Sequence, residues 1–240
     1  VNGEKAFFDQ VGSAAAVKRT SRHGDTPLIE TPHTRRMVTM SDYEYADLID
    51  DQDRVRLLID PTSTYGRAAA AAMGRAMDDE IIAAALGTSL TGKDGSTSTV
   101  LPAGQKIAHG SAGLTIANAA SVDPSIPRHI IVSPKQVSDL LNNTTVTSSD
   151  FNTVKALAQG EINTFVGFNF IVSNRLTDDG TSRQVIAFAS DGLKVAMGKE
   201  PSAKIDERAD KSYATQVYYC QTMGATRMEE AKVVEIACNE

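Results

Sequence analysis

Tryptophan is absent from this sequence, and aromatic residues make up only 5% of it. Platforms on which nucleic-acid bases stack are therefore not expected. The two cysteines, Cys220 and Cys238, are too few for a disulfide framework, so we expect two reduced thiols on neighbouring strands and intracellular synthesis. No apolar run approaches the roughly 18 residues of a membrane-spanning helix, so no membrane partner is expected.

Motifs that carry catalytic or cofactor chemistry are also missing. The sequence has no phosphate-binding glycine loop, no H-E-x-x-H and no G-x-S-x-G. Its histidines, His23, His33, His109 and His129, lie in dissimilar contexts with poor spacing for a metal site. The sequence therefore predicts no catalytic residue, no metal and no cofactor. An enzyme with an unrecognised site in residues 121–187 remains an alternative.

The composition is that of a soluble acidic protein. Of the 240 residues 41% are hydrophobic, which is enough for one sizeable core or two modest lobes. The net charge of −6 argues against wrapping nucleic acid over the whole surface, because neutralising phosphates requires an excess of lysine and arginine.

The longest run of helix-forming residues spans 61–86 and predicts a single alanine-rich helix, which we call the spine helix. Asp60 can cap it, Pro61 suits the first helical position, and Gly87 suits a left-handed stop at the C-terminal end. Arg75 precedes Asp78 and Asp79 by three and four residues, a spacing that predicts ion pairs along the helix. The small residues would let the C-terminal strands pack closely against it.

The segments before the helix are rich in charge and poor in large apolar residues. Residues 1–26 predict an extended arm or a short helix that is ordered by what it touches. Alternating patterns in 34–40, 43–49 and 54–59 predict a long hairpin or small sheet. The residues expected on its outward side, at a contact between subunits or on a solvated ribbon, are Arg35, Arg36, Asp42, Glu44 and Asp47.

After the helix, the pattern predicts a compact lobe and a projecting hairpin. Strands at 128–134, 165–173 and 183–188, with helices from Ser133 and Asp150, form the lobe. Alternating strands at 213–223 and 232–238 predict a hairpin with the charged stretch before them. The charged residues at its tip are Lys204, Asp206, Glu207, Arg208, Asp210 and Lys211. The fold class is α+β.

This order of elements resembles the major capsid proteins of tailed double-stranded-DNA bacteriophages, whose fold is named after bacteriophage Hong Kong 97. The local sequences that look like this family are Asp60–Tyr65, Arg128–Gln136, Gly167–Leu176 and Gly224–Ile236. The resemblance implies an N-terminal arm at 1–26, an extended loop at 27–60, a peripheral domain at 61–120 and 188–240, and an axial domain at 121–187. The tip at 204–211 would meet two others near threefold axes.

The resemblance also implies a function and partners. Copies would form hexamers and pentamers of an icosahedral head, assembled in the host cytoplasm, that encloses double-stranded DNA contacted non-specifically. A portal and scaffolding or cement proteins are further expected partners. A nanocompartment shell of the encapsulin kind is the alternative within the same fold.

One departure from the family can be read directly from the sequence. Some members join their subunits through a lysine in the extended loop and an asparagine near the threefold axis. Residues 27–61 contain no lysine and residues 204–213 contain no asparagine. We therefore expect a shell without these crosslinks.

Overall fold

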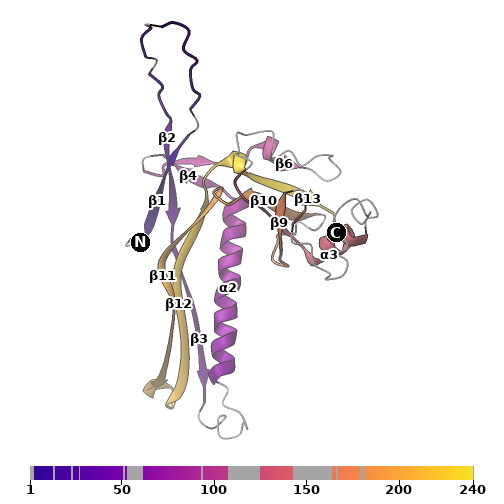
Figure 1. The fold of residues 1–240 in the computed structure, drawn as a ribbon. Coiled ribbons are helices and arrows are strands. Elements are labelled where there is room, and N and C mark those ends of the chain that lie inside the picture. The colour runs from indigo at the N-terminus through magenta and orange to yellow at the C-terminus, as the bar shows by residue number, and fades with distance from the viewer. Residues whose placement is uncertain are drawn as a thin grey trace.

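The long helix and a three-stranded sheet form the main axis of the molecule. The computed structural model describes residues 3–12, 14–22, 24–26, 28–50, 52, 62–92, 94–107, 125–142, 164–165, 167–178, 180 and 182–239. Helix α2 (Thr62–Leu86) runs alongside a sheet with the order β11 (Leu193–Arg208), β12 (Ala214–Arg227) and β3 (Ser41–Ile49) (Figure 1). The predicted helix is therefore present, whereas Asp60 and Pro61 lie outside the described residues. In the described part of the chain, no helix is long and apolar enough to cross a membrane.

One face of α2 packs on strand β12 (Ala214–Arg227). Ala69 and Met73 are buried there, and Gln221 Nε2 donates to the carbonyl oxygen of Met73 at 3.2 Å. The glycines of the helix, Gly66 and Gly74, are not among the small residues that allow this close packing. A Cβ added at Gly66 or Gly74 would have no atom within 4 Å, so both lie on open surface.

The end of α2 also differs from the prediction. Gly87 does not adopt a left-handed conformation; its N–H donates to Ala83 O at 2.8 Å, continuing the helical pattern. A Cβ at this position would lie 2.7 Å from the same oxygen. Glycine is thus favoured at position 87 by close approach rather than by a positive φ.

A second sheet carries the projecting part of the molecule. Its order is β1 (Lys5–Val11), β2 (His33–Thr39), β4 (Ser89–Thr91) and β5 (Thr97–Thr99), with all pairs antiparallel. The loop between β1 and β2 extends away from the rest of the chain (Figure 1). The N-terminal segment is therefore a paired strand in this sheet over Lys5–Val11.

The hairpin expected across residues 34–59 is wrong in its pairing. Strands do form at His33–Thr39 and at β3 (Ser41–Ile49), but they belong to different sheets. β2 pairs with β1 and β4, whereas β3 pairs with β12 from Ser41↔Met223 to Ile49↔Thr215. The run at 54–59 lies outside the described residues.

Gly224 of β12 allows the chain to pass from β2 in one sheet to β3 in the other. A Cβ at Gly224 would lie 2.5 Å from Thr39 O and 2.8 Å from Val38 Cγ1, so β2 crosses β12 at backbone distance. A small apolar cluster closes the crossing, formed by Ala6, Val38, Met40 and Ala196 with Phe8 against them.

The projecting hairpin is made by β11 (Leu193–Arg208) and β12. The 3₁₀ turn η2 (Ala209–Lys211) lies at its tip. The predicted second strand at 213–223 therefore continues to Arg227 and pairs with β11. The strand expected at 232–238 is β13 (Val233–Cys238), which belongs to another sheet.

That other sheet is six-stranded and lies to one side of the upper end of α2 (Figure 1). Its order is β6 (Lys106–Ile107), β13, β10 (Arg183–Ala189), β7 (Arg128–Val132), β9 (Phe168–Val172) and β8 (Thr164–Phe165). The main core joins this sheet to Ile82 and Ala85 of α2. The described fold is α+β, as predicted.

Short helices complete the described chain. Helix α3 (Pro134–Asn142) begins where predicted, and Ser133 and Gln136 cap it reciprocally: Gln136 N donates to Ser133 Oγ and Ser133 N to Gln136 Oε1. Two further 3₁₀ turns are η1 (Ala103–Gln105) and η3 (Glu230–Lys232). The helix expected from Asp150 lies outside the described residues.

Candidate subunit-contact surfaces

Arg35 and Arg36, predicted together at a subunit contact, lie on opposite faces of β2. Arg35 Nε donates to Asp9 Oδ1 at 2.6 Å, and its guanidinium lies 5.6 Å from the centre of the Phe7 ring on β1. Arg36 is buried and bonds inside the chain, to Met228 O at 2.8 Å and to both carboxylate oxygens of Glu230. Because strand side chains alternate, Arg36 is not part of an exposed contact surface.

The three carboxylates of β3 predicted at the same contact have acceptor roles within the chain. Asp42 accepts from Thr222 Oγ1 at 2.6 Å, and Glu44 accepts from Tyr218 OH at 2.9 Å, both across the β3–β12 pair. Asp47 accepts from the backbone N–H of Leu48 at 2.9 Å. Asp42 and Glu44 are nevertheless exposed, so their remaining lone pairs face outward.

The charged residues of the hairpin tip lie where the sequence indicated. Lys204, Asp206, Glu207, Asp210 and Lys211 are exposed, and Arg208 is partly so. Arg208 forms an ion pair with Asp210 inside the tip, and its Nη1 lies 3.4 Å from Gln216 Oε1. The guanidinium accordingly lowers the pKa of the Asp210 carboxyl. Next to this pair, Tyr213 has a φ of 58° and is 67% exposed.

The ion pairs predicted along the spine helix are replaced by a contact between elements. Asp79 pairs with Arg175, which follows β9, through Arg175 Nε at 2.8 Å and through Nη2. This hydrogen bond lowers the pKa of Asp79, to which Arg75 adds a smaller charge effect. Within the described residues, no ion pair forms at Arg75 or Asp78, and both side chains are exposed.

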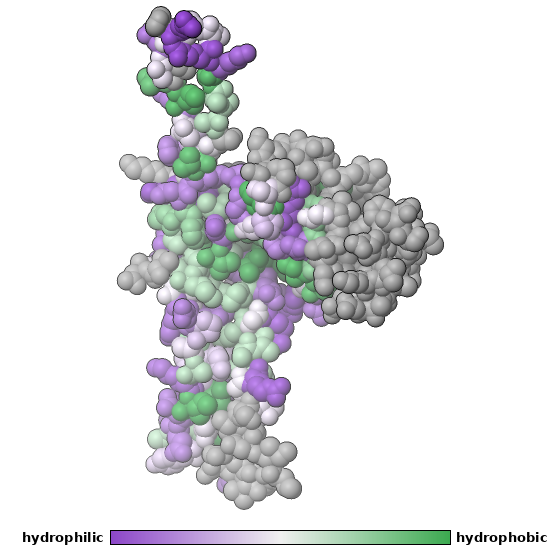
Figure 2. Space-filling view, in the orientation of Figure 1, coloured by the Kyte–Doolittle hydropathy of each residue, from purple (hydrophilic) through white to green (hydrophobic). Residues whose placement is uncertain are grey.

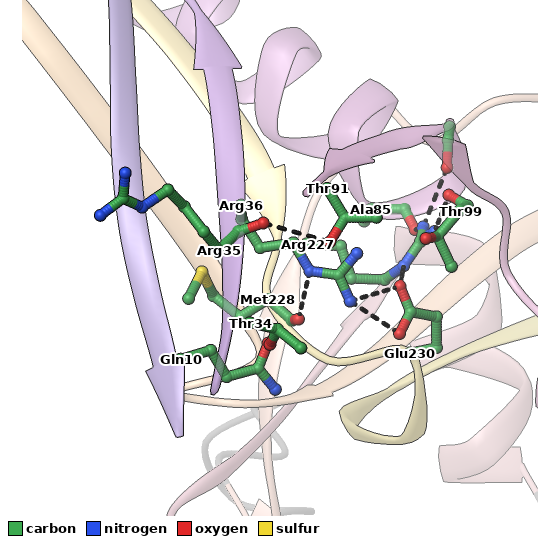
Figure 3. A network of polar contacts seen from close by, with 11 residues as sticks. Gln10, Thr34, Arg35, Arg36, Ala85, Thr91, Thr99, Arg227, Met228 and Glu230 are labelled. Carbon is green, nitrogen blue, oxygen red and sulfur yellow. Dashed lines mark hydrogen bonds and ion pairs between the residues drawn. The ribbon is translucent and has the colours of Figure 1, made fainter. Parts of the chain in front are cut away.

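A buried polar network at the upper end of β12 was not predicted (Figure 3). Arg227 is fully buried and caps the C-terminal end of α2: its Nη1 donates to Ala85 O at 2.7 Å and to Gly87 O at 3.0 Å. Its Nη2 reaches Thr99 O at 3.3 Å. We call this set, with Arg36 and Glu230, the arginine junction. Burial lowers the pKa of Arg227, and the charge of Glu230 opposes that shift.

Strand alternation is the signal that could have located the arginine junction. Gln221 and Arg227 are both odd-numbered positions of β12, and both side chains bond to carbonyl groups of α2. Their even-numbered neighbours, Tyr218 and Cys220, therefore lie on the opposite face of the sheet.

The described residues contain no group of three or more His, Cys, Asp or Glu side chains placed to hold a metal ion. The hollow at the base of the projecting loop is lined by Asp9, His33, Thr34, Arg35, Thr91 and Gly92. Arg35 and Asp9 are already paired there, and Thr91 Oγ1 donates to Arg35 O at 3.1 Å. The arrangement is that of a strand junction in which Arg35 bonds to Asp9 and to Thr91.

A family model described as phage capsid protein matches residues 1–240. The chain belongs to the phage capsid protein family. Among curated proteins, none matches the sequence significantly.

Solved capsids resemble the fold of this capsid protein. The capsid of cyanophage P-SCSP1u has a TM-score of 0.71 at 18% identity, covering 100% of this chain and 84% of that one. The Ralstonia phage GP4 capsid has a TM-score of 0.71 at 11% identity, with coverages of 100% and 84%. The Mycobacterium phage Che8 structure has a TM-score of 0.69 at 16% identity, covering 98% of this chain and 85% of that one.

These likenesses identify the fold as the Hong Kong 97 type, as expected from the sequence. Family membership makes the chain a structural protein of the virion that associates with copies of itself into capsomers. The family and the solved capsids do not favour the nanocompartment or the enzyme alternative.

Proposed function

We propose that copies of this chain form the hexamers and pentamers of an icosahedral phage head that encloses double-stranded DNA. Assembly takes place in the host cytoplasm, with a portal and scaffolding or cement proteins as partners. The observation that carries this proposal is the loop between β1 and β2, which presents large apolar side chains far from the core. Exposed apolar surface of this kind marks sites of protein contact.

The projecting loop combines apolar and basic residues. Leu28 is 97% exposed and Val17 is 60% exposed, and Ile29 is also exposed. Figure 2 draws hydrophobic residues on the loop below a hydrophilic end. Large apolar side chains are unfavourable on a loop that contacts only solvent. We therefore infer that this loop, residues 12–32, lies on a neighbouring copy. It spans the boundary expected between an arm at 1–26 and an extended loop at 27–60.

The other domain boundaries also follow the sheets in this proposal. The peripheral domain consists of α2 with β3, β11 and β12. The axial domain consists of the six-stranded sheet, which takes β13 from the C-terminal end and contains β10 across the expected boundary at 187–188. The tip of β11–β12 meets other copies near threefold axes. Because Arg208 and Asp210 already pair within the tip, the charges left for such contacts are Lys204, Asp206, Glu207 and Lys211.

We propose that the shell lacks lysine–asparagine crosslinks, and of the two reasons given by the sequence only the missing asparagine still applies. The projecting loop carries Lys18, so a lysine is present in the element that reaches a neighbour. The tip at 204–213 contains no asparagine, so the second partner of the bond is missing. Denaturing electrophoresis of assembled particles should give a monomer band; a covalent ladder contradicts this.

A paired substitution tests the loop contact. Leu28→Ser with Ile29→Ser should abolish shells in electron micrographs of cells expressing the full chain, while the subunit keeps its circular dichroism and melting temperature. Ala15→Ser in the same loop is the matched control and should assemble like the parent. Normal shells from the double variant, or a parent chain that forms no icosahedral particles, would overturn the proposal. Nuclease-protected double-stranded DNA in virions decides against a protein-filled compartment.

A further inference from the structure

An irregularity in the β11–β12 pair gathers three reactive or polar side chains on one face. The register shifts between Met197 and Lys199 and again between Lys199 and Ser202. Both Lys199 and Ser202 consequently lie against Cys220 of β12: Lys199 Nζ is 2.8 Å from Cys220 Sγ, and Ser202 Oγ is 3.1 Å from it. Ser202 is the register partner of Cys220, whereas Lys199 pairs with Thr222 and reaches Cys220 through its long side chain.

The surroundings favour the charged forms of the thiol and the amine. The Lys199 ammonium group and the Ser202 hydroxyl lower the pKa of Cys220, and the thiolate in turn raises the pKa of Lys199. Glu44 lies opposite Cys220 on β3, and its charge with that of Asp42 adds to the shift at Lys199. Cys220 itself is 7% exposed, which leaves access for a small oxidant rather than for a second protein.

We propose that Lys199 and Cys220 are a modification site at which dioxygen joins the two side chains through a single oxygen atom. The ammonium, the thiolate and one dioxygen give a nitrogen–oxygen–sulfur bridge and one water. Two N–H bonds and the O–O bond break, while N–O and O–S bonds form. Nitrogen and sulfur each lose two electrons, and dioxygen gains all four.

The geometry favours this product over the other oxidation products of cysteine. The amine nitrogen is in contact with the sulfur, so an oxygen atom added between them can bond to both before further oxidant reaches the sulfur. One oxygen bonded to both atoms spans a separation close to the one observed, so neither strand needs to move. The neighbouring-strand placement expected for the two cysteines is wrong: Cys238 lies on β13 of the six-stranded sheet, which makes it an internal comparison.

The bridge would brace the hairpin within one chain. It closes the irregular section of β11 onto β12 without joining two copies, so the chain still migrates as a monomer under denaturing conditions. It forms when the protein passes from a reducing cytoplasm to an aerated medium. The bridge depends on the contacts within this hairpin and does not require shell assembly.

Mass spectrometry of the full chain tests the site. Protein prepared under reductant and then incubated in aerated buffer should gain one oxygen and lose two hydrogens, and dithiothreitol should reverse the change. Trypsin should fail to cut after Lys199, leaving peptide 195–204 linked to peptide 212–227. The thiol titre of the unfolded chain should fall from two to one.

Matched variants keep the test decisive. Lys199→Arg retains the charge and should abolish the bridge, as should Cys220→Ser. Lys204→Arg on the same strand and Cys238→Ser should bridge like the parent. A bridge that persists in Lys199→Arg overturns the proposal. So does oxygen added to Cys220 alone with Lys199 still cleaved, a disulfide-linked dimer, or an unchanged mass after aeration.

Discussion

The two ends of β12 use charged residues in opposite ways. At the upper end, Arg227 is buried and bonds to carbonyl groups of α2 and β5, with β2 crossing nearby at Gly224. At the lower end, the charged tip of the hairpin extends past the helix and stays exposed (Figure 1). Whether other elements cover a charged side chain, and not its residue type, therefore decides whether it stabilises the subunit or remains available to other copies.

Removing the buried charge should have the largest effect. Arg227→Met leaves Ala85 O, Gly87 O and Thr99 O without their donor, while Glu230 keeps its bonds to Arg36. Breaking a buried charged contact on one side typically costs roughly 3–5 kcal/mol. We expect a loss of that size in the free energy of unfolding of unassembled subunits, measured by urea titration.

The matched change at the other end of β12 should barely alter the free energy of unfolding of the subunit. Lys211→Met removes an exposed charge from the tip, and such surface substitutions usually stay within about 0.5 kcal/mol. It should instead weaken assembly, which is read from the fraction of protein in particles. Equal losses of subunit stability in the two variants would show that the two ends of β12 do not differ in this way.

Two glycines, one covered by a crossing strand and one on an open helix face, should also respond differently to substitution by alanine. Gly224→Ala places a Cβ against the backbone of β2, which cannot move aside as a side chain could. Overpacking of this kind costs about 1–3 kcal/mol, and we expect the thermal midpoint to fall. Gly74→Ala on the open face of α2 should raise stability by about 1 kcal/mol, because alanine favours helix and its Cβ meets nothing.

These two alanine variants are each other's control, since they add the same group. Differential scanning calorimetry of unassembled subunits should give shifts of opposite sign. If Gly224→Ala is neutral, β2 does not cross β12 at contact distance. If Gly74→Ala is stabilising in the subunit yet prevents shells, a neighbouring copy covers that helix face.

Local patterns made much of this fold predictable. The alanine-rich run predicted α2, and period-two alternation predicted β2, β3 and β12, because each signal lies within one segment. The pairing of those strands was not predictable in the same way. The residues that pair with β3 lie between 166 (Ile49↔Thr215) and 182 (Ser41↔Met223) positions further along the chain, and no local pattern distinguishes a hairpin from two strands in separate sheets.

The sequence predicts which charged residues lie on these strands, but not which of them are exposed and which are buried. Arg35 and Arg36 are adjacent and chemically identical in sequence, yet one faces outward on β2 and the other enters the arginine junction. Alternation states that they face opposite ways, but the side that becomes covered depends on Glu230, far along the chain. The Asp79–Arg175 pair escaped prediction for the same reason.

The smallest expected effect lies on the open face of the lower sheet. Glu44 accepts the Tyr218 hydroxyl at 2.9 Å, and this bond, with burial, raises the pKa of Tyr218 to about 12. A raised folded-state pKa gives stability that is complete below the ordinary tyrosine pKa of about 10 and is lost as the pH rises through about 12. Glu44→Gln removes the carboxylate, so the pKa of Tyr218 should fall toward its ordinary value.

Ultraviolet titration after a rapid pH jump measures this directly, because one of the six tyrosines should ionise last. Tyr218→Phe should delete that final step, and Glu44→Gln should move it to lower pH. Asp42→Asn is the matched control, since Asp42 accepts from Thr222 and should leave the titration unchanged. If the final step stays at the same pH in Glu44→Gln, the carboxylate of Glu44 does not bond to Tyr218 within the chain. It would then count, like the charges of the tip, among the groups available to a neighbouring copy.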